Sequence, residues 1–222
     1  ISSGIHATVR NFSSISGFHD GISSDGDYAT ISDCTVHDNR AVGIRSYGNY
    51  THIKRNFAFN QGDVGILSWG HYSDVVENYV SDSRNGILSQ GNFANITGNA
   101  GNSNRNYGIY AGGMYTGPDP GEEGHGYYPR LTENVAILNS IGGIACSFPH
   151  AVIRDNSVFQ NQKYGITLGS WSNNTTISDN YLSDNPVGIM IPDSLSNISV
   201  TGNLIRSEEL SGVFIRSGSG AG

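Results

Sequence analysis

A Gly-Ile pair recurs along almost the whole chain, and its spacing constrains the fold more than any other feature of the sequence. Glycine is followed by isoleucine, or once by valine, at Gly21, Gly43, Gly65, Gly86, Gly108, Gly143, Gly165, Gly188 and Gly212. The successive intervals are 22, 22, 21, 22, 35, 22, 23 and 24 residues. A fixed period in this range is typical of solenoids, in which each repeat packs only on its neighbours.

Two further columns of residues keep the same register. About nine positions after each Ile comes an apolar residue, at Ile31, Ile53, Val75, Ile96, Leu131, Ile153, Ile177 and Val200. Three positions later comes asparagine, at Asn56, Asn78, Asn99, Asn134, Asn156, Asn180 and Asn203, with Cys34 in the first place. Asparagines stacked at one turn can pass hydrogen bonds from coil to coil through their side-chain amides.

Each repeat contains three short β-branched runs separated by Gly, Asn, Asp and Ser, which predicts three strands and three turns per coil. Glycine is frequent, with 30 residues, and only 14% of the chain is charged, which argues against helical bundles and coiled coils. A leucine-rich repeat of similar period would need several leucines in each repeat, and that motif is missing. Nine coils about 4.8 Å apart would form a rod about 43 Å long.

The Gly-Ile repeats and the asparagine column resemble the right-handed parallel β-helix superfamily, the pectate-lyase-like fold that includes carbohydrate-active and NosD-type repeats. The resemblance covers essentially the whole chain. It implies an all-β, single-stranded, right-handed parallel β-helix of about nine coils of ~22 residues, with three strands per coil. We assign residues 1–216 to this domain and residues 217–222 to a flexible tail or linker, and we expect the chain to belong to a longer polypeptide.

The single 35-residue interval contains about 13 extra residues, which we assign to an insert loop at residues 116–129. Inserts leave a solenoid at a turn and often carry function. Glu122, His125 and Tyr127 are candidate substrate-binding residues in this loop. Gly124-His125-Gly126 spells a motif of polygalacturonases, but it does not follow a strand, and we treat it as coincidence.

Strand alternation predicts which side chains face outward next to the Gly-Ile strands. The coils before the insert place polar and aromatic residues there, whereas the later coils place mostly small or apolar ones. The candidate catalytic residues are Asp25, Arg45, His71 and Tyr110. The candidate substrate-binding residues on the same face are Asp27, Tyr47, Trp69, Gln90 and Asn92.

Exposed aromatic rings flanked by polar groups suit sugar rings, so the sequence predicts a polysaccharide groove over the first five coils. A lyase or epimerase could use His71 as base, Tyr110 or Tyr47 as acid and Arg45 to neutralise a uronate. A hydrolase needs two carboxylates, for which Asp25 and Asp27 are candidates. The Asp-Asp and Asn-Thr-Asp patterns of polygalacturonases and the Asp-Pro-His-Glu motif of alginate epimerases are absent.

Two more columns have an ordinary structural interpretation. The aromatic column Tyr28, Tyr50, Tyr72, Phe93 and Tyr115 is predicted to stack from coil to coil. His19, Asp63 and Arg84 lie just before the Gly-Ile strands and could form a second polar edge. Cys34 and Cys146 fall five coils apart, beyond disulfide reach, so both are predicted to be reduced and buried.

The leading hypothesis is a polysaccharide-active β-helix that acts on an acidic or cell-surface glycan by lyase or hydrolase chemistry. The alternative is a noncatalytic carbohydrate-binding or structural module of a larger secreted or surface protein. A net charge of -7 argues against nucleic acid as a partner, and no apolar run is long enough to insert in a membrane. We expect no obligatory metal or cofactor, with Ca²⁺ as the open alternative, and an extracellular, cell-surface or periplasmic location.

Overall fold

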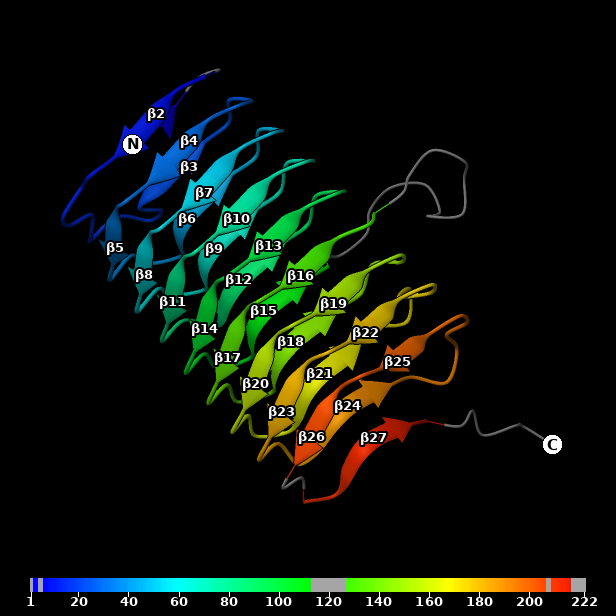
Figure 1. Cartoon of the computed structure of the whole chain (residues 1–222). Coiled ribbons are helices and arrows are strands. Elements are labelled where there is room, and N and C mark those ends of the chain that lie inside the picture. Colours follow the sequence, from blue (N-terminus) through cyan, green and yellow to red (C-terminus); the bar gives the residue numbers. More distant parts are fainter. Residues whose placement is uncertain (1, 4–5, 113–126, 207–208, 217–222) are drawn as a thin grey trace.

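The computed structural model of the protein describes residues 2–3, 6–112, 127–206 and 209–216. Within these residues the chain forms 27 strands in three parallel sheets that wind around a common axis (Figure 1). Each coil contributes one strand to each sheet, which confirms the predicted parallel solenoid of about nine coils with three strands per coil. The remaining residues, including the candidates Glu122 and His125, lie outside the described residues.

We name the sheets A, B and C by their order within a coil. Sheet A contains β1 (Ser2–Ser3), β3 (Ile22–Ser24), β6 (Val42–Ser46), β9 (Val64–Ser68), β12 (Asn85–Ser89), β15 (Tyr107–Ala111), β18 (Gly142–Cys146), β21 (Tyr164–Leu168), β24 (Val187–Ile191) and β27 (Ser211–Ile215). Sheet B contains β2 (Thr8–Arg10), β4 (Thr30–Ser32), β7 (His52–Lys54), β10 (Asp74–Val76), β13 (Asn95–Thr97), β16 (Arg130–Thr132), β19 (Val152–Arg154), β22 (Thr176–Ser178) and β25 (Ser199–Thr201). Sheet C contains β5 (Thr35–His37), β8 (Phe57–Phe59), β11 (Tyr79–Ser81), β14 (Ala100–Asn102), β17 (Val135–Ile137), β20 (Ser157–Phe159), β23 (Tyr181–Ser183) and β26 (Leu204–Arg206).

The isoleucine of each Gly-Ile pair forms an unbroken internal ladder in sheet A. Ile22 pairs with Ile44, and the same register continues from coil to coil as far as Val213. Ile109 pairs directly with Ile144, so the residues between them return the chain to the same register. These isoleucines are fully buried, and their burial is the main stabilising contribution that this sheet makes to the core.

The glycine of every pair from Gly21 to Gly188 leaves no room for a Cβ atom. A Cβ atom on Gly43 would lie 2.6 Å from the carbonyl oxygen of Gly65, and one on Gly65 would lie 2.0 Å from Cγ1 of Val80. The glycine therefore allows sheet A to pack closely against sheet C inside the coil.

The predicted asparagine ladder is confirmed at the corner between sheets B and C. Asn56 Nδ2 donates to Asn78 Oδ1 at 3.0 Å, and the backbone N–H of Asn56 donates to the same oxygen at 2.9 Å. This pattern repeats along the ladder, in which nearly every asparagine is buried. Each buried amide is thus satisfied by the coils on either side, so the ladder fixes the stacking register.

A second ladder, which the sequence analysis did not predict, lies at the corner between sheets C and A. Its members are Asn39, Gln61, Ser83, Asn104, Asn139, Asn161 and Asn185. The residue type changes from Asn to Gln to Ser along this column, which hides it in the sequence. The shared feature is a buried side-chain oxygen that accepts a hydrogen bond from the preceding coil.

Each corner of the coil turns at a residue with positive φ. In the second coil these residues are Tyr28, Asp33 and Asp38, with φ of 58°, 57° and 53°. Asn, Asp and Gly tolerate this left-handed conformation well, whereas a bulky aromatic residue there is uncommon.

Both cysteines are buried and free, as predicted. Cys34 occupies the first position of the asparagine ladder, where its backbone N–H donates to Asn56 Oδ1. Cys146 occupies the core side of β18, and burial raises the pKa of its thiol to about 12. Neither thiol is therefore activated for nucleophilic or redox chemistry at neutral pH.

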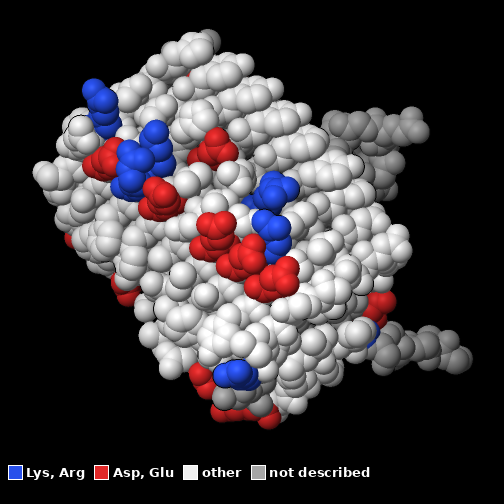
Figure 2. All heavy atoms as spheres, in the orientation of Figure 1, with Lys and Arg blue, Asp and Glu red and all other residues white. Residues whose placement is uncertain are grey.

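Charged side chains on the face seen in Figure 2 gather in narrow groups of mixed sign and leave most of that surface uncharged. Some of these charges pair between neighbouring coils. In the Asp33–Arg55 pair, for example, Arg55 Nε donates to Asp33 Oδ1 at 2.8 Å. Among the described residues drawn on this face there is no extended basic patch of the kind that binds nucleic acid.

Candidate functional site

The outer face of sheet A brings together many of the side chains that the sequence analysis selected. Arg45, Leu67, Leu88 and Tyr110 are neighbours in one column, because β6, β9, β12 and β15 pair in that register. The column is flanked on one side by the residues just after each strand and on the other by the first residue of each strand. The predicted alignment of these residues in one column is confirmed by the strand pairing.

The floor of this face is apolar in the coils before the insert. Val42, Val64 and Leu67 form a hydrophobic cluster separate from the core, with Ala41 and Leu88 packed against it. Val42 clusters outside the main core, although strict alternation would put it on the same face of β6 as the buried Ile44. Val42, Val64 and Leu67 are 2%, 3% and 7% exposed, so this cluster lies just beneath the outer face of the first coils. We call it the apolar strip; the sequence analysis did not predict it.

Arg45 is held in a bidentate ion pair with Asp20. Its Nη1 and Nη2 atoms each lie 3.2 Å from a carboxylate oxygen of Asp20, and both side chains are mostly buried. Asp20 also accepts from the backbone N–H of Val42 at 3.2 Å. The guanidinium charge is therefore compensated within the protein, which limits how far Arg45 could neutralise a substrate carboxylate.

The Nε–H of Arg45 is buried and has no hydrogen-bond partner among the described residues. The Arg45 guanidinium also lies over the ring of Tyr47, at 5.9 Å from its centroid, and donates to the Tyr47 hydroxyl at 3.4 Å. Arg45 thus connects the ion pair to the aromatic residues next to it.

Tyr47 and Trp69 form an exposed aromatic pair on this face. Their ring centroids are 5.5 Å apart with an interplanar angle of 30°, and they are 43% and 47% exposed. Gln90 follows in the same column one coil further along and is partly exposed. The tilted rings leave ring surface accessible, which is the arrangement that suits stacking against a flat apolar ligand face.

Tyr110 lies at the far end of the apolar strip, next to Leu88. Its hydroxyl is 3.1 Å from Oγ of Ser147, and its ring lies 5.7 Å from that of Tyr107. Burial raises the pKa of Tyr107. Tyr110 keeps a hydroxyl at the surface, bonded to another hydroxyl that can either donate or accept.

Asp27, Asn49, His71 and Asn92 form a surface ladder at the turn after sheet A. The Asn49 N–H donates to Asp27 Oδ1 at 2.7 Å, the His71 N–H donates to Asn49 Oδ1 at 2.8 Å, and the Asn92 N–H donates to His71 Nδ1 at 3.0 Å. An accepting Nδ1 requires the neutral tautomer with hydrogen on Nε2. His71 therefore has a structural role that competes with the role of a general base.

Two predicted site residues are placed differently from the rest. Asp25 is exposed next to the aromatic pair and has no partner among the described residues. Tyr127 is only 8% exposed and stacks on Phe148 at 4.4 Å, so its ring belongs to the core and not to an exposed insert. Tyr127 takes the position that Asn92 has one coil earlier, because the Phe93 N–H donates to the Tyr127 carbonyl as the Tyr72 N–H does to the Asn92 carbonyl.

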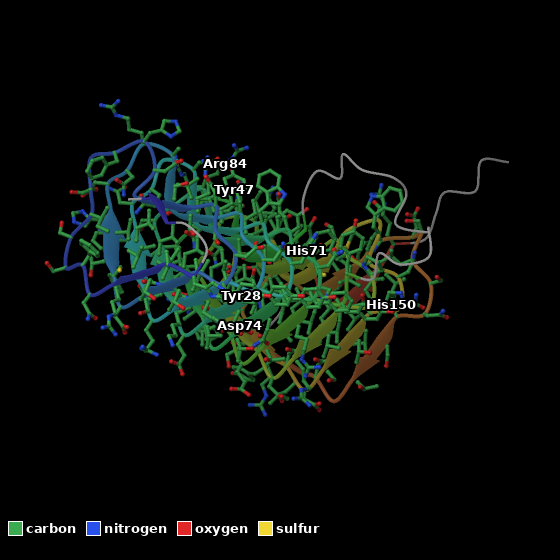
Figure 3. The ribbon with its side chains drawn as sticks, turned by 90° about the horizontal axis from the view of Figure 1, so that it is seen from above. Tyr28, Tyr47, His71, Asp74, Arg84 and His150 are labelled. Atoms are coloured by element: carbon green, nitrogen blue, oxygen red, sulfur yellow. The ribbon has the colours of Figure 1, made fainter. Side chains whose placement is uncertain are left out.

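The polar edge expected before the Gly-Ile strands is present. His19, Asp63 and Arg84 lie in one column that runs through Ala41, and Arg84 Nη1 is 3.8 Å from Asp63 Oδ1. Figure 3 labels Arg84 and Tyr47 on the same side of the solenoid, with Asp74 on the opposite side. This column borders the apolar strip on the side opposite the aromatic pair.

The predicted aromatic column is longer than expected, and one member is corrected. Its rings stack in the order His6, Tyr28, Tyr50, Tyr72, Phe93, Tyr128 and His150. Tyr128 stacks on Phe93 in the position that the sequence analysis gave to Tyr115, because the extra residues precede this turn instead of following it. Tyr28 and His150 mark the course of the column in Figure 3.

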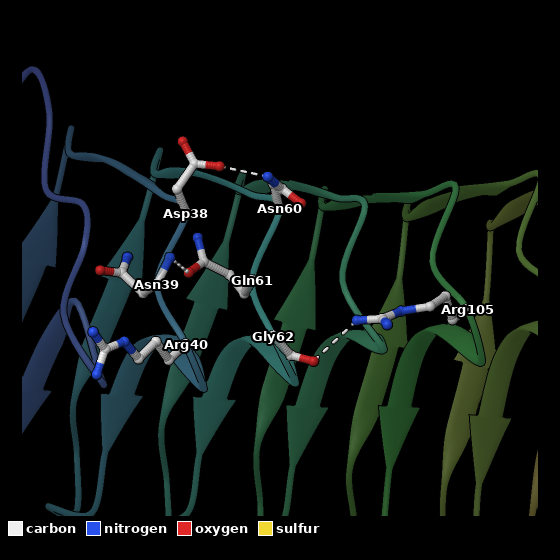
Figure 4. A pocket seen from close by; sticks show the side chains of 7 residues that line it. All are labelled: Asp38, Asn39, Arg40, Asn60, Gln61, Gly62 and Arg105. Carbon is white, nitrogen blue, oxygen red and sulfur yellow. Dashed lines mark hydrogen bonds between the residues drawn. The ribbon is translucent and has the colours of Figure 1, made fainter.

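Two hollows lie away from the outer face of sheet A. A space of about 320 Å³ lies beside the corner between sheets C and A, lined by Asp38, Asn39, Arg40, Asn60, Gln61, Gly62 and Arg105 (Figure 4). Arg105 closes one side by donating to the Gly62 carbonyl at 2.9 Å. A larger apolar space of about 500 Å³, lined by residues such as Ile191, Leu195 and Ile215, opens where the core reaches the last coil.

No group of three or more His, Cys, Asp or Glu side chains that could hold a metal ion occurs in residues 6–112, 127–206 or 209–216. The histidines there are dispersed, and several are paired with single acids, as in His52–Asp74 at 3.0 Å. Among the same residues, no helix could cross a membrane.

The fold and the surface define a right-handed β-helix protein with aromatic and charged side chains on the outer face of sheet A, and the family models agree. Residues 1–119 match the model of the right-handed β-helix region. Residues 63–221 match the model described as NosD, periplasmic copper-binding protein. The chain belongs to the NosD family of right-handed β-helices. A search of curated proteins finds no significant match.

Proposed function

We propose that this β-helix domain, residues 1–216, binds an extended glycan along the outer face of sheet A. The observation that carries the proposal is the exposed Tyr47–Trp69 pair beside the apolar strip of Val42, Val64 and Leu67. Sugar rings present apolar C–H faces that stack on aromatic rings, while their hydroxyls need polar partners at the rim.

Polar partners are available on both sides of the strip. Gln90 and the free carboxylate of Asp25 lie on the aromatic side, and Asp63 and Arg84 lie on the other. The Nε–H of Arg45 lies nearby and is unpaired among the described residues, but it is buried, so a ligand oxygen would reach it only after neighbouring side chains move.

The charges favour a ligand that is neutral or only weakly acidic on this strip. Arg45 is compensated by Asp20, and Arg84 lies near Asp63. An acidic glycan, one of the two ligand classes that the sequence suggested, would therefore depend on hydroxyl contacts and stacking more than on ion pairs.

Cleavage of the glycan, by a lyase or a hydrolase, is the second candidate function. One observation favours it, namely the exposed Asp25 carboxylate next to the aromatic pair, which has no partner among the described residues. Its proposed partner Asp27 already accepts a backbone hydrogen bond, and His71 accepts another, so binding without cleavage is better supported.

The family description suggests copper and the periplasm. We propose a periplasmic or outer-envelope location on that basis. The donor set does not fit copper, because the described histidines lie on different corners or on different coils, no group of three or more metal-binding side chains occurs among the described residues, and both thiols are buried. We therefore assign copper no role in the proposed function.

Isothermal titration against a panel of linear polysaccharides, neutral and uronate-containing, tests the proposal. The Trp69→Ala variant should weaken binding about tenfold, which corresponds to about 1.4 kcal/mol, since one stacking surface is lost. Tyr181→Ala is the matched control, because Tyr181 is an equally exposed aromatic residue on sheet C and should leave binding unchanged.

Each outcome distinguishes the candidates. An equal loss of affinity in Trp69→Ala and Tyr181→Ala, or no binding to any glycan, would overturn the glycan proposal. New reducing ends or the ultraviolet absorbance of unsaturated uronates in the same mixtures would establish cleavage, and Asp25→Asn should then abolish it.

A further inference from the structure

A Ser-His-Asp constellation lies on the first two coils, at the end of sheet C and outside the apolar strip of sheet A. Ser14 Oγ is 2.9 Å from His37 Nε2, and His37 Nδ1 is 2.6 Å from Asp38 Oδ2. The serine and the acid therefore contact opposite nitrogens of one imidazole ring. This is the connectivity that nucleophilic hydrolases use.

The backbone holds the three residues in place. His37 is the last residue of β5, and Asp38 follows it at the corner with φ of 53°. Ile15, which follows Ser14, makes two backbone hydrogen bonds to β5. Its N–H donates to Thr35 O, and its carbonyl accepts from the His37 N–H, both at 3.0 Å. Ser14 thus reaches His37 from a fixed position in the adjacent coil.

The protonation pattern follows from the partners. Hydrogen bonds from His37 and then from Asn60 lower the pKa of Asp38, which keeps its carboxylate ionised at neutral pH. A carboxylate only accepts hydrogen bonds, so Nδ1 of His37 carries the hydrogen. Nε2 is then free to accept the hydroxyl hydrogen of Ser14, as a general base must.

The ring of His37 is restrained on one face by Phe59, whose ring is stacked at 5.1 Å and 6°. The corresponding positions of the later coils contain Ser81, Asn102 and Ile137. The repeat therefore does not require histidine at this position.

The serine is open to solvent. Ser14 is exposed, and its backbone N–H donates to no acceptor among the described residues. The nucleophile's own N–H is a common donor to the oxyanion that forms during acyl transfer. The exposed rings of Phe12 and Phe18 in the same loop give apolar surface for an acyl or alcohol group.

We propose that Ser14, His37 and Asp38 form an acyl-transfer site that hydrolyses carboxylic esters. The Ser14 oxygen bonds to the acyl carbon, its proton passes to His37 Nε2, and the ester C–O bond breaks as that proton goes to the leaving alcohol. Water then bonds to the acyl carbon and gives a proton to His37 Nε2. The bond from that carbon to Ser14 Oγ breaks as the proton passes to Oγ, which releases the carboxylic acid and restores the Ser14 hydroxyl. Asp38 is a positioning residue that holds the imidazole and its tautomer.

Hydrolysis of p-nitrophenyl acetate by the whole chain is the first test. Ser14→Ala should lower the rate at least about tenfold, because nucleophile and base act as a unit. Ser16→Ala is the matched control, since Ser16 is exposed in the same loop without a histidine contact. An exposed histidine alone can cleave this activated ester, so a rate in Ser14→Ala equal to that of the unaltered protein would overturn the proposal.

A fluorophosphonate probe tests the nucleophile directly. Peptide mass spectrometry should find the phosphonyl group on Ser14 in the folded chain and lose it in His37→Phe, which keeps an aromatic ring against Phe59. Labelling of another serine, or none, would also overturn the proposal.

Asp38→Asn tests the positioning role. Asparagine tolerates the positive φ at this corner, so the fold should be retained. The kcat should fall while the KM for the ester stays unchanged, because the tautomer and not the binding surface is altered. An unchanged kcat would remove Asp38 from the site.

Discussion

The His71 Nδ1 atom accepts a hydrogen bond from the backbone N–H of Asn92, 3.0 Å away in the next coil. This single contact joins the turns of two coils on the face proposed to bind a glycan. It also shows that a side chain selected for its chemistry can serve the same purpose as the asparagine and aspartate that precede it in the ladder.

Replacing His71 tests that structural role. His71→Ala should destabilise the fold by about 0.5–1.5 kcal/mol, because the Asn92 N–H loses its acceptor. His71→Asn should recover most of that loss, since the amide oxygen of Asn49 accepts the equivalent hydrogen bond in the preceding coil. Urea unfolding of the two variants checks this, and equal destabilisation by Ala and Asn would contradict it.

The internal asparagine ladder should be far more sensitive. Asn134 accepts from Asn99 and donates to Ile96 O at 2.8 Å and to Asn156 Oδ1 at 3.0 Å, all in the core. Asn134→Ala leaves at least two buried polar groups without partners, at roughly 1–3 kcal/mol each, so a loss of about 3 kcal/mol is expected.

Asn203→Ala is the comparison for that variant, because Asn203 ends the ladder and is only partly buried. Chemical denaturation should show a smaller loss there. If the two substitutions lowered the free energy of unfolding by the same amount, burial would not determine how much each asparagine stabilises the ladder.

The stacked aromatic column combines strain with attraction. Tyr72 has φ of 54° and stacks on Tyr50 at 5.0 Å and on Phe93 at 4.8 Å. Tyr72→Ala should destabilise the protein by about 1–3 kcal/mol, since stacking is lost while the strained φ remains.

Tyr72→Gly loses the same contacts but relieves the backbone, so its thermal unfolding midpoint should lie above that of Tyr72→Ala. The reverse order would show that the turn is not strained. The column would then owe its residue type to stacking alone.

The Asp33–Arg55 pair gives a pH dependence of known sign. Hydrogen bonds from Arg55 lower the pKa of Asp33 below its ordinary value, so the folded state binds that proton less tightly than the unfolded state. The stabilising contribution is present above the unfolded pKa of about 3.9 and is lost as the pH falls through the folded pKa.

Thermal unfolding of Asp33→Asn against the unaltered protein checks this contribution. The difference in midpoint should be small at pH 7, because both side chains are exposed, and should disappear near pH ~2. A difference that grows on acidification would contradict the sign.

The fold was predictable from the sequence because its determinants repeat. The Gly-Ile pairs and the column from Asn56 to Asn203 recur at nearly constant spacing, and the structure places them on one ladder each. The second ladder escaped detection because Asn39, Gln61 and Ser83 share a hydrogen-bonding function but not a residue type.

The site was less predictable, because its contacts join residues about one coil apart outside any repeated column. Asp20 and Arg45 are 25 positions apart, and Ser14 and His37 are 23 apart. Alternation assigned Arg45 to the outer face, but nothing in the pattern showed that an acid would compensate its charge. Tyr128 replaced Tyr115 in the aromatic stack because the exit point of an insert depends on the turn and not on the period.

The reciprocal amide ladder has a consequence for how such a chain can change in length. Each asparagine side chain donates a hydrogen bond to one neighbour and accepts one from the other, as Asn134 does between Asn99 and Asn156. A residue added within a strand would move the rest of that strand out of register, whereas residues added at a turn leave the ladder intact, as the pairing of Ile109 with Ile144 shows. Duplicating a whole coil would likewise leave all contacts intact. Evolution can therefore lengthen or shorten this protein in whole turns, with each new turn free to acquire its own surface chemistry.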